Sequence, residues 1–329
     1  MEYKSYFNNN DLIYNVWKSK YQYNDESPDG TIQRIAKAIA DNELRYKNNY
    51  TDEKTALLSE YGQQLFKTLY HSTDKDYTYN IFYNLLKDYG KLIPGGSILA
   101  TLGTDKKSTL SNCYVVESPK DSVSSIIDSI KITANIFKRR GGCGCDISNL
   151  RPRGANVNNA ASSSTGAVSF MNFYSVNAET IGAEARRAAQ MISISDRHPD
   201  IEEFIKIKSD LSKIPGANLS IMLSRDLKNA ALQDKDWNLC FPVDNKFLQN
   251  YGDHCSDYSE IPYDTLIQTG ENQYIKKVKA KKLFDMIIYH AHKFAEPGIL
   301  LKDNLFDYDP SSVYEDLKFV STNPLILAA

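Results

Sequence analysis

The chain has 329 residues, 42% of them hydrophobic and 24% charged, and its formal net charge is −2. The length accommodates one large α/β domain or two smaller ones, and the near-neutral charge excludes a global field that attracts nucleic acid or an anionic membrane. No apolar run reaches the ~20 residues that cross a bilayer, and the N-terminal residues lack the continuous apolar core of a signal peptide.

The cysteines indicate a cytoplasmic protein without a disulfide scaffold. There are five, an odd number, and their spacing is irregular in a long chain. That pattern is typical of a reducing compartment. Cys143 and Cys145 lie close together, but no second pair or nearby histidine completes four ligands, so no metal site is expected.

Residues 10–90 have the pattern of a helical block. The segments 29–46, 51–72 and 77–96 each carry apolar residues at helical spacing. In the first of them the apolar stripe consists of Ile32, Ile35, Ala36 and Ile39. Pro94-Gly95-Gly96 ends the block. We therefore predict a helical N-terminal domain over residues 1–93 and a second domain over residues 94–329.

In the second domain, short β-prone runs alternate with amphipathic helices. Strands are predicted at 113–118, 217–224 and 319–324, and helices at 121–139 and 280–298. Asp121 or Ser122 can cap the first of these helices, and Gly141 supplies its stop. Such alternation favours an α/β fold in which parallel strands are joined by crossover helices.

The segments that enter the first strand carry small polar side chains. Ser97 follows a Gly-Gly turn, and Ser111-Asn112-Cys113 lead into the strand. Hydroxyls and backbone N–H groups near glycines suit phosphate or ribose oxygens. The alternative is that Ser111 and Asn112 close a turn and Cys113 is a small buried hydrophobic residue.

The segment 139–157 is rich in glycine and arginine. Gly141, Gly142 and Gly144 allow a backbone to approach a ligand closely, and Arg151 and Arg153 can grip a phosphate. The alternative is a glycine-rich bend with solvated arginines. These glycines follow a helix and do not open one, so they are not a dinucleotide-binding fingerprint.

Two later segments are less specific. Arg186 and Arg187 lie among small residues. The segment is either a mobile loop that binds an anion or a basic patch on a helix. His198 precedes Pro199 and several acidic residues, which indicates a helix start more than a catalytic histidine. Together the segments predict phosphate or nucleotide binding, without a hydrolase, Walker or zinc-protease motif.

Taken in order, several stretches resemble the large, catalytic subunit of ribonucleotide reductase, and most of all its cobalamin-dependent type and related class I chains. They are LSNCYVVES, GGCGCDISNLRPRGANV, STGAVSFMNFYS, RRAAQMISISDRHPDIEEFIKIK and VSTNP. The resemblance runs from about residue 10 to residue 324. It implies a helical domain followed by the first half of a ten-stranded α/β barrel. It also implies reduction of ribonucleotides by radical chemistry, with adenosylcobalamin or a metal-bearing small subunit as the radical source.

The resemblance implies roles for individual residues. Cys113 would be one of the redox pair that reduces the 2′-carbon. Residues near the substrate would be Ser97, Ser111, Asn112, Gly141 and Gly142. Asp121 would hold the ribose, and Arg151 the phosphates, of a dNTP or ATP effector. Arg186 and Arg187 would lie in the loop that relays effector identity to substrate choice, and the helix at 121–139 would pair across a homodimer.

The last residues differ from the family's pattern, Asn-Pro-Cys-Gly-Glu. In that motif the asparagine holds the substrate ribose, the cysteine becomes the thiyl radical and the glutamate acts as a base. This sequence has Asn323-Pro324-Leu325-Ile326-Leu327. We therefore expect the N-terminal half of a split reductase, inactive alone and completed by a C-terminal half that carries the radical cysteine. The alternatives are a non-catalytic nucleotide-binding regulatory protein derived from a reductase, and a truncated product.

Overall fold

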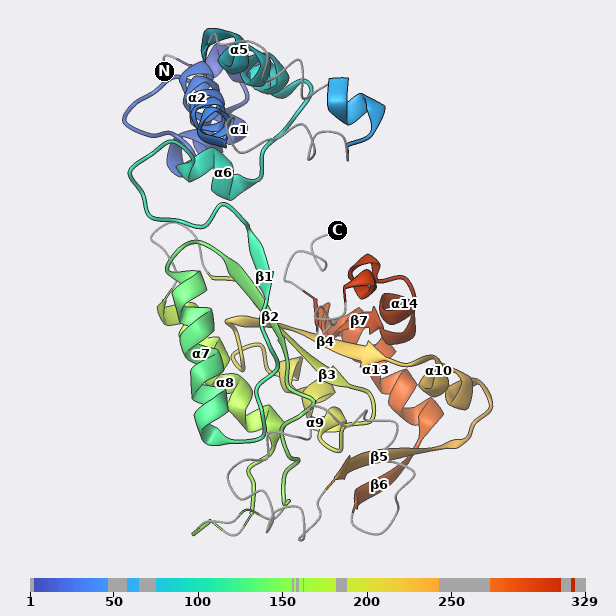
Figure 1. Cartoon of the computed structure of the whole chain (residues 1–329). Coiled ribbons are helices and arrows are strands. Elements are labelled where there is room, and N and C mark those ends of the chain that lie inside the picture. The colour runs from blue at the N-terminus through green and yellow to red at the C-terminus, as the bar shows by residue number, and fades with distance from the viewer. Residues whose placement is uncertain are drawn as a thin grey trace. The chain divides into compact units, whose positions relative to one another are not determined.

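The computed structural model describes residues 3–46, 58–64, 75–155, 157, 160–161, 163–181, 188–242, 273–314 and 321–322. The chain forms two compact units, Met1–Asn112 and Cys113–Ala329 (Figure 1). The division predicted after residue 93 stays a prediction. None of the helices in the described ranges combines the length and the apolar character that crossing a membrane requires.

The first unit is helical, as predicted. Its elements are η1 (Lys4–Phe7), α1 (Asp11–Lys20), α2 (Pro28–Tyr46), α5 (Lys75–Leu86), η3 (Lys87–Tyr89) and α6 (Gly96–Thr101). The apolar stripe of α2 supplies Ile32, Ile35 and Ala36 to a buried cluster with Leu86 and Leu99. Arg34 pairs with Glu26 at 2.9 Å and donates to the Leu99 carbonyl at 3.0 Å, which ties α2 to α6.

The second unit contains a curled parallel sheet with the order β1-β2-β3-β4-β7. The strands are β1 (Cys113–Val115), β2 (Gly142–Asp146), β3 (Gln190–Ser195), β4 (Ala217–Leu223) and β7 (Gly298–Leu301). Its helices are α7 (Val123–Phe137), α8 (Ala167–Thr180), α9 (Ile201–Lys206), η4 (Ile207–Ser209), α10 (Arg225–Leu232), α13 (Ala280–Phe294), α14 (Lys302–Asp307) and η6 (Pro310–Val313). A separate antiparallel ribbon pairs β5 (Asp236–Pro242) with β6 (Gln273–Lys279). The prediction of an α/β half-barrel that follows a helical region in the sequence is confirmed.

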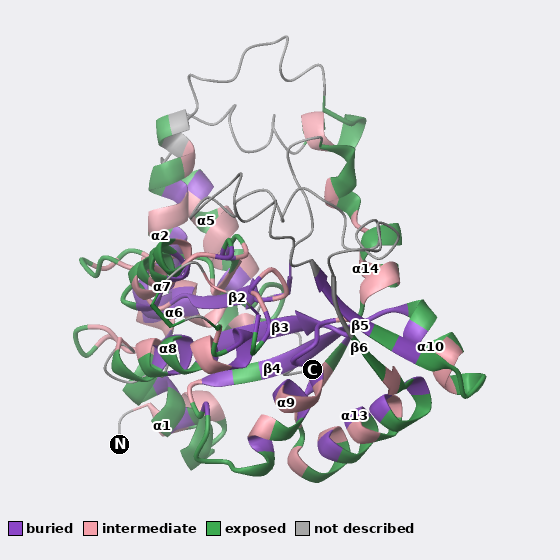
Figure 2. Ribbon diagram, turned by 90° about the horizontal axis from the view of Figure 1, so that it is seen from below, coloured by how far each residue is buried: buried purple, intermediate pink, exposed green. Residues whose placement is uncertain are grey.

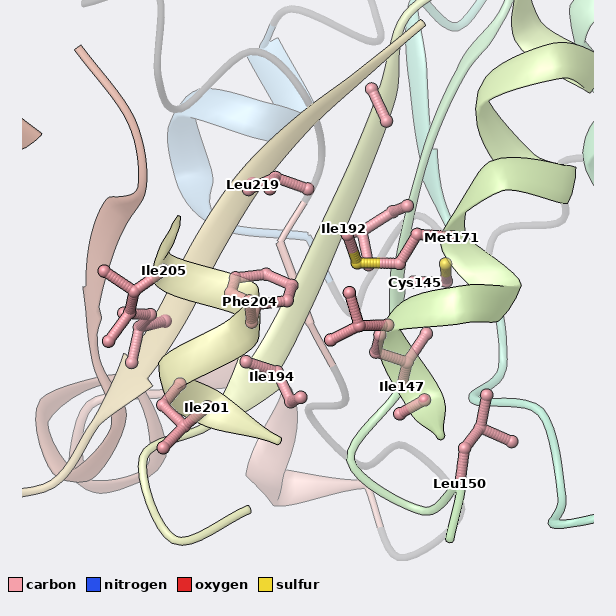
Figure 3. Close-up of a cluster of buried hydrophobic side chains, with 14 of the residues drawn as sticks. Cys145, Ile147, Leu150, Met171, Ile192, Ile194, Ile201, Phe204, Ile205 and Leu219 are labelled. Carbon is pink, nitrogen blue, oxygen red and sulfur yellow. The ribbon is translucent and has the colours of Figure 1, made fainter. Parts of the chain in front are cut away.

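The two faces of the parallel sheet differ in chemistry. Cys145, Ile192 and Leu219 belong to one apolar cluster with Met171 of α8 and Phe204 of α9 (Figure 3). Because successive side chains of a strand point to opposite faces, the residues between them face away from these helices. Of these other residues, Met191 and Met222 are apolar, and most of the rest are small or polar, among them Gly144, Asp146, Ser193, Asn218 and Ser220. Strands β2, β3 and β4 are largely buried (Figure 2).

Several strands of the described chain escaped prediction from the sequence, and β2 shows why. Gly142–Asp146, which has the composition of a glycine-rich bend, is the strand β2 and is buried along its whole length. It pairs in parallel with β1 on one side and β3 on the other. Hydrogen bonding on both sides therefore overrides the low strand propensity of glycine.

The predicted helix over 121–139 is observed as α7, with Ser122 as the cap. The Ser122 hydroxyl accepts the Ser125 N–H at 3.2 Å. The prediction that Gly141 supplies the helix stop was wrong, because the left-handed residue is Arg140, with φ 72°. Gly141 is required by packing, since a Cβ there would lie 2.5 Å from Ile136 Cγ2.

The other predicted boundaries hold to different extents. The strand at 217–224 is β4, and the strand at 113–118 is the shorter β1. The helix expected over 280–298 ends at Phe294 as α13, because Ala295 adopts a left-handed conformation with φ 59°. Of the strand expected at 319–324, the structure describes only Ser321 and Thr322, and they are not in a strand.

Candidate functional site

The thiol predicted to be catalytic begins the edge strand of the sheet. Cys113 is half-buried, is not in a disulfide, and lies opposite Gly142 in the β1–β2 register. A Cβ at Gly142 would lie 3.4 Å from Cys113 Sγ and 3.1 Å from the Ala189 carbonyl oxygen. Glycine at this position therefore lets the thiol and the Ala189 carbonyl pack closely against the buried backbone of β2. The structure brings together Cys113, Gly141 and Gly142, three of the predicted residues.

In the helical unit, the predicted residues Ser97 and Asn112 contact each other. The Ser97 N–H donates to Asn112 Oδ1 at 3.0 Å, which fixes the start of α6. The Ser97 side chain is fully buried, and its Oγ has no hydrogen-bond partner among the described residues. Ser111 lies in the turn before Asn112, where its N–H donates to Thr109 Oγ1 at 3.2 Å.

The two predicted effector ligands form an ion pair. Arg151 Nε lies 2.7 Å from Asp121 Oδ2, and the Arg151 backbone N–H donates to Asp121 Oδ1 at 3.0 Å. Both oxygens of the Asp121 carboxylate thus contact one residue. Burial raises the pKa of Asp121, and the Arg151 guanidinium opposes that rise. The pair joins the start of α7 to the loop that follows β2.

A buried histidine and aspartate hold the loop that carries Arg151. His198 Nε2 lies 2.8 Å from the Leu150 carbonyl oxygen, and His198 Nδ1 accepts the Asp200 N–H at 3.0 Å. The Asp200 carboxylate accepts the N–H of Arg153 and that of Ala167. Burial lowers the pKa of His198, so the ring is neutral and structural, as the sequence indicated. The helix begins at Ile201 instead of Pro199, and Asp200 is its N-cap.

The sequence analysis did not predict a row of buried polar groups on the polar face of the sheet, which is the face that points away from α8 and α9. Ser193 Oγ lies 2.7 Å from Asp146 Oδ2 and 2.8 Å from Ser321 Oγ. The signal was present in the strand MISIS, because a serine at every second position of a buried strand gives it one polar face.

A second buried carboxylate lies where β3 ends. Asp196 Oδ2 accepts the Ser224 N–H at 2.7 Å and the Ser224 hydroxyl at 2.6 Å. Asp196 Oδ1 has no hydrogen-bond partner among the described residues. Burial raises the pKa of Asp196 to about 6. This carboxyl therefore changes its charge near neutral pH.

Some predicted residues cannot be placed. Arg186, Arg187 and Asn323 lie outside the described residues. In the part of the chain that the structure describes, no three His, Cys, Asp or Glu side chains gather as a metal site would require.

Comparison with known proteins identifies the family. Residues 111–324 match the model described as ribonucleotide reductase, barrel domain. The chain is 31% identical over 233 residues to a vitamin B12-dependent ribonucleoside-diphosphate reductase of Thermoplasma acidophilum, covering 70% of this chain and 26% of that protein. It is 30% identical over 207 residues to a ribonucleoside-diphosphate reductase large chain of Cryptosporidium parvum, covering 59% and 24%.

A third relative extends the similarity toward the N-terminus. The ribonucleoside-diphosphate reductase NrdEB subunit alpha of Bacillus subtilis is 23% identical over 292 residues, covering 84% of this chain and 26% of the relative. The chain thus spans about a quarter of the length of these relatives. The matched family model and the half-barrel agree, and the chain belongs to the ribonucleotide reductase family through its barrel domain.

Proposed function

We propose that this chain forms the first part of a cytoplasmic ribonucleotide reductase catalytic subunit, which reduces ribonucleoside diphosphates to deoxyribonucleotides. The observation that carries the proposal is Cys113, whose thiol lies beside the backbone of Gly142 at the edge of a half-barrel of the reductase family. The substrate class is taken from the relatives, whose names describe ribonucleoside-diphosphate reductases.

In the proposed reaction, Cys113 is one of two thiols that reduce the 2′-carbon. The C2′–O bond breaks and a C2′–H bond forms. The oxygen leaves as water, and two thiols supply the two electrons and the two hydrogens as they form a disulfide. Cys143 and Cys145, the two cysteines of β2, are poor candidates for the second thiol, because both lie in the apolar cluster on the helix-covered face and burial raises the pKa of each. The second thiol therefore comes from a segment other than β2.

The radical-bearing thiol also comes from outside this sequence. Leu325 follows Asn323-Pro324, and a leucine side chain has no S–H group from which a thiyl radical can form. We propose that a complementary C-terminal half supplies the radical cysteine and the general base. In that assembly Asn323 holds the substrate ribose, and Ser97, Ser111, Asn112, Gly141 and Gly142 contact the substrate.

Adenosylcobalamin is the cofactor that the names of several relatives indicate. Among the described histidines, His198 is fully buried with both ring nitrogens in hydrogen bonds, so it is not available to hold this cofactor.

We propose that Asp121 and Arg151 bind a dNTP or ATP effector, with Arg186 and Arg187 in the loop that relays its identity. The contact between Asp121 and Arg151 supports this assignment, because a nucleotide that reached the guanidinium would also be close to the carboxylate. Calorimetry with dATP is expected to show binding that Asp121→Ala and Arg151→Ala weaken. Arg153→Ala is the control on the same loop, because that side chain pairs with Glu203 at 2.7 Å.

We propose a homodimer through α7 and α8. These helices expose Val123, Ile127 and Ile132 on α7 and Phe173 and Val176 on α8. The Asn177 side chain donates to Thr133 Oγ1 at 2.9 Å, so the two helices form one surface. Analytical ultracentrifugation is expected to show a dimer that Ile127→Glu converts to a monomer; an unaltered chain that stays monomeric at all concentrations would contradict the proposal.

The reductase proposal is tested by reconstitution. The chain is mixed with the C-terminal part of a related reductase that contains the radical cysteine, and formation of deoxyribonucleoside diphosphate is measured. We expect turnover that Cys113→Ser abolishes. Cys143→Ala, at a neighbouring thiol on the opposite face, is expected to retain it. Stable association without turnover under any radical-generating condition would reject the proposal.

A further inference from the structure

The hydrogen-bonded row Asp146–Ser193–Ser321 joins three separate segments. Asp146 ends β2, Ser193 lies opposite it in β3, and Ser321 is 128 residues further along the chain than Ser193. Their side chains are 8%, 0% and 2% exposed. A contact of such long sequence separation, made by buried hydroxyls, requires close shape complementarity between the segment at 321–322 and the sheet.

The charge of Asp146 gives the row a direction. An ionised carboxylate only accepts hydrogen bonds, so the Ser193 hydroxyl donates to Asp146 Oδ2 and its oxygen is left to accept from Ser321. Asp146 Oδ1 accepts the Ser148 N–H at 2.9 Å. Burial raises the pKa of Asp146, and the hydrogen bonds from Ser148 and Ser193 and the positive charge of Lys302 oppose that rise. The carboxylate therefore holds two hydroxyls in sequence, and hydrogen bonds to a charged acceptor are the stronger kind.

The anchored segment leads directly to a residue of the proposed site. Ser321 and Thr322 are both buried, and Asn323 follows them in the sequence. Ser321 is attached to the polar face of the sheet, which is the face that Cys113 shares with Gly142 by strand alternation. The row thus connects the segment before Asn323 to the strands that carry the other reductase residues.

We propose that Asp146 and Ser193 are positioning residues, which hold Ser321 and the segment leading to Asn323 against the polar face of the sheet. The role of Asn323 itself rests on the proposed function. Neither Asp146 nor Ser193 needs to touch the substrate, because both act through Ser321.

Hydrogen–deuterium exchange in the 329-residue chain tests the anchor without any need for catalysis. In Ser193→Ala, the backbone amides of Ser321 and Thr322 are expected to exchange about tenfold faster. Ser321→Ala leaves the sheet unchanged and is expected to give the same acceleration at Thr322. The double variant should exceed neither single variant, since both remove one link.

Ser220→Ala is the matched control. Ser220 is the register partner of Ser193 on β4, is fully buried, and its Oγ has no hydrogen-bond partner among the described residues. Its removal should leave exchange at 321–322 unchanged. An equal acceleration in Ser220→Ala, or no acceleration in Ser193→Ala and Ser321→Ala, would overturn the proposal.

Kinetics of the reconstituted reductase separate the two proposals. Ser193→Ala should lower kcat/KM about tenfold, whereas Ser193→Thr, which keeps the hydroxyl, should restore most of it. Faster exchange with unchanged kcat/KM would reject a positioning role in catalysis. If the unaltered assembly shows no turnover but the exchange difference persists, the reductase function fails and the anchor stands.

Discussion

The two faces of the parallel sheet are built from the same strands and serve different purposes. On β4, Ile221 points into the apolar cluster with Phe204 and Leu283, whereas its neighbour Ser220 points to the opposite face. Both are fully buried. The helix-covered face gains its stability from apolar burial, while the opposite face presents glycines, hydroxyls and a carboxylate, which are the groups that bind and position. The residues that stabilise the fold and the residues that bind or position other groups therefore lie on opposite faces of the sheet.

The largest expected effect compares these two neighbours. Ile221→Ala removes buried methyl groups and leaves a cavity, so the free energy of unfolding should fall by about 2–5 kcal/mol. Ser220→Ala removes a hydroxyl that has no partner among the described residues, and the change should stay within about 1 kcal/mol. Chemical denaturation measures both. Equal losses would show that the faces do not differ in the way we describe.

The next effect concerns the carboxylate at the end of β3. The pKa of Asp196 is raised from 3.8 to about 6, so between these values the folded protein binds more protons than the unfolded chain. Stability therefore falls as pH rises from about 4 to about 6 and stays lower above that. Relative to Asp196→Asn, the unaltered protein should lose about 3 kcal/mol across this interval. A pH-independent difference between the two proteins would contradict the assignment.

The smallest effect lies between the helices that cover the sheet. Thr133→Val removes the nearer of two acceptors of the Asn177 side chain, in the partly buried contact between α7 and α8. The free energy of unfolding is expected to fall by about 1 kcal/mol. Asn135→Ala, on the exposed side of α7, should change it by less than about 0.5 kcal/mol. Thermal unfolding measures the stability of both variants. An equal loss of stability in Asn135→Ala would contradict a specific contribution of the hydrogen bond between the helices.

Sequence patterns predicted the elements whose signals are local. The stripe of Ile32, Ile35 and Ala36 identified α2, and the β-prone run at 217–224 identified β4. The order of the motifs placed Cys113 and Gly142 in one region, where the strand register brings them opposite each other. These predictions succeeded because helical and strand periodicities arise from backbone geometry over a few residues.

By itself, the sequence determined the α/β class, the helical N-terminal region and the membership of the reductase family, since periodicity and motif order are properties of the linear chain. Only the tertiary structure decided that the glycine-rich run is the strand β2, that Asp121 and Arg151 pair, and that Ser193 reaches Ser321 across 128 residues. Parallel strand pairing and buried hydrogen bonds join segments that are distant in the sequence. The partners in these contacts are therefore determined by the tertiary fold, and no local sequence pattern specifies them.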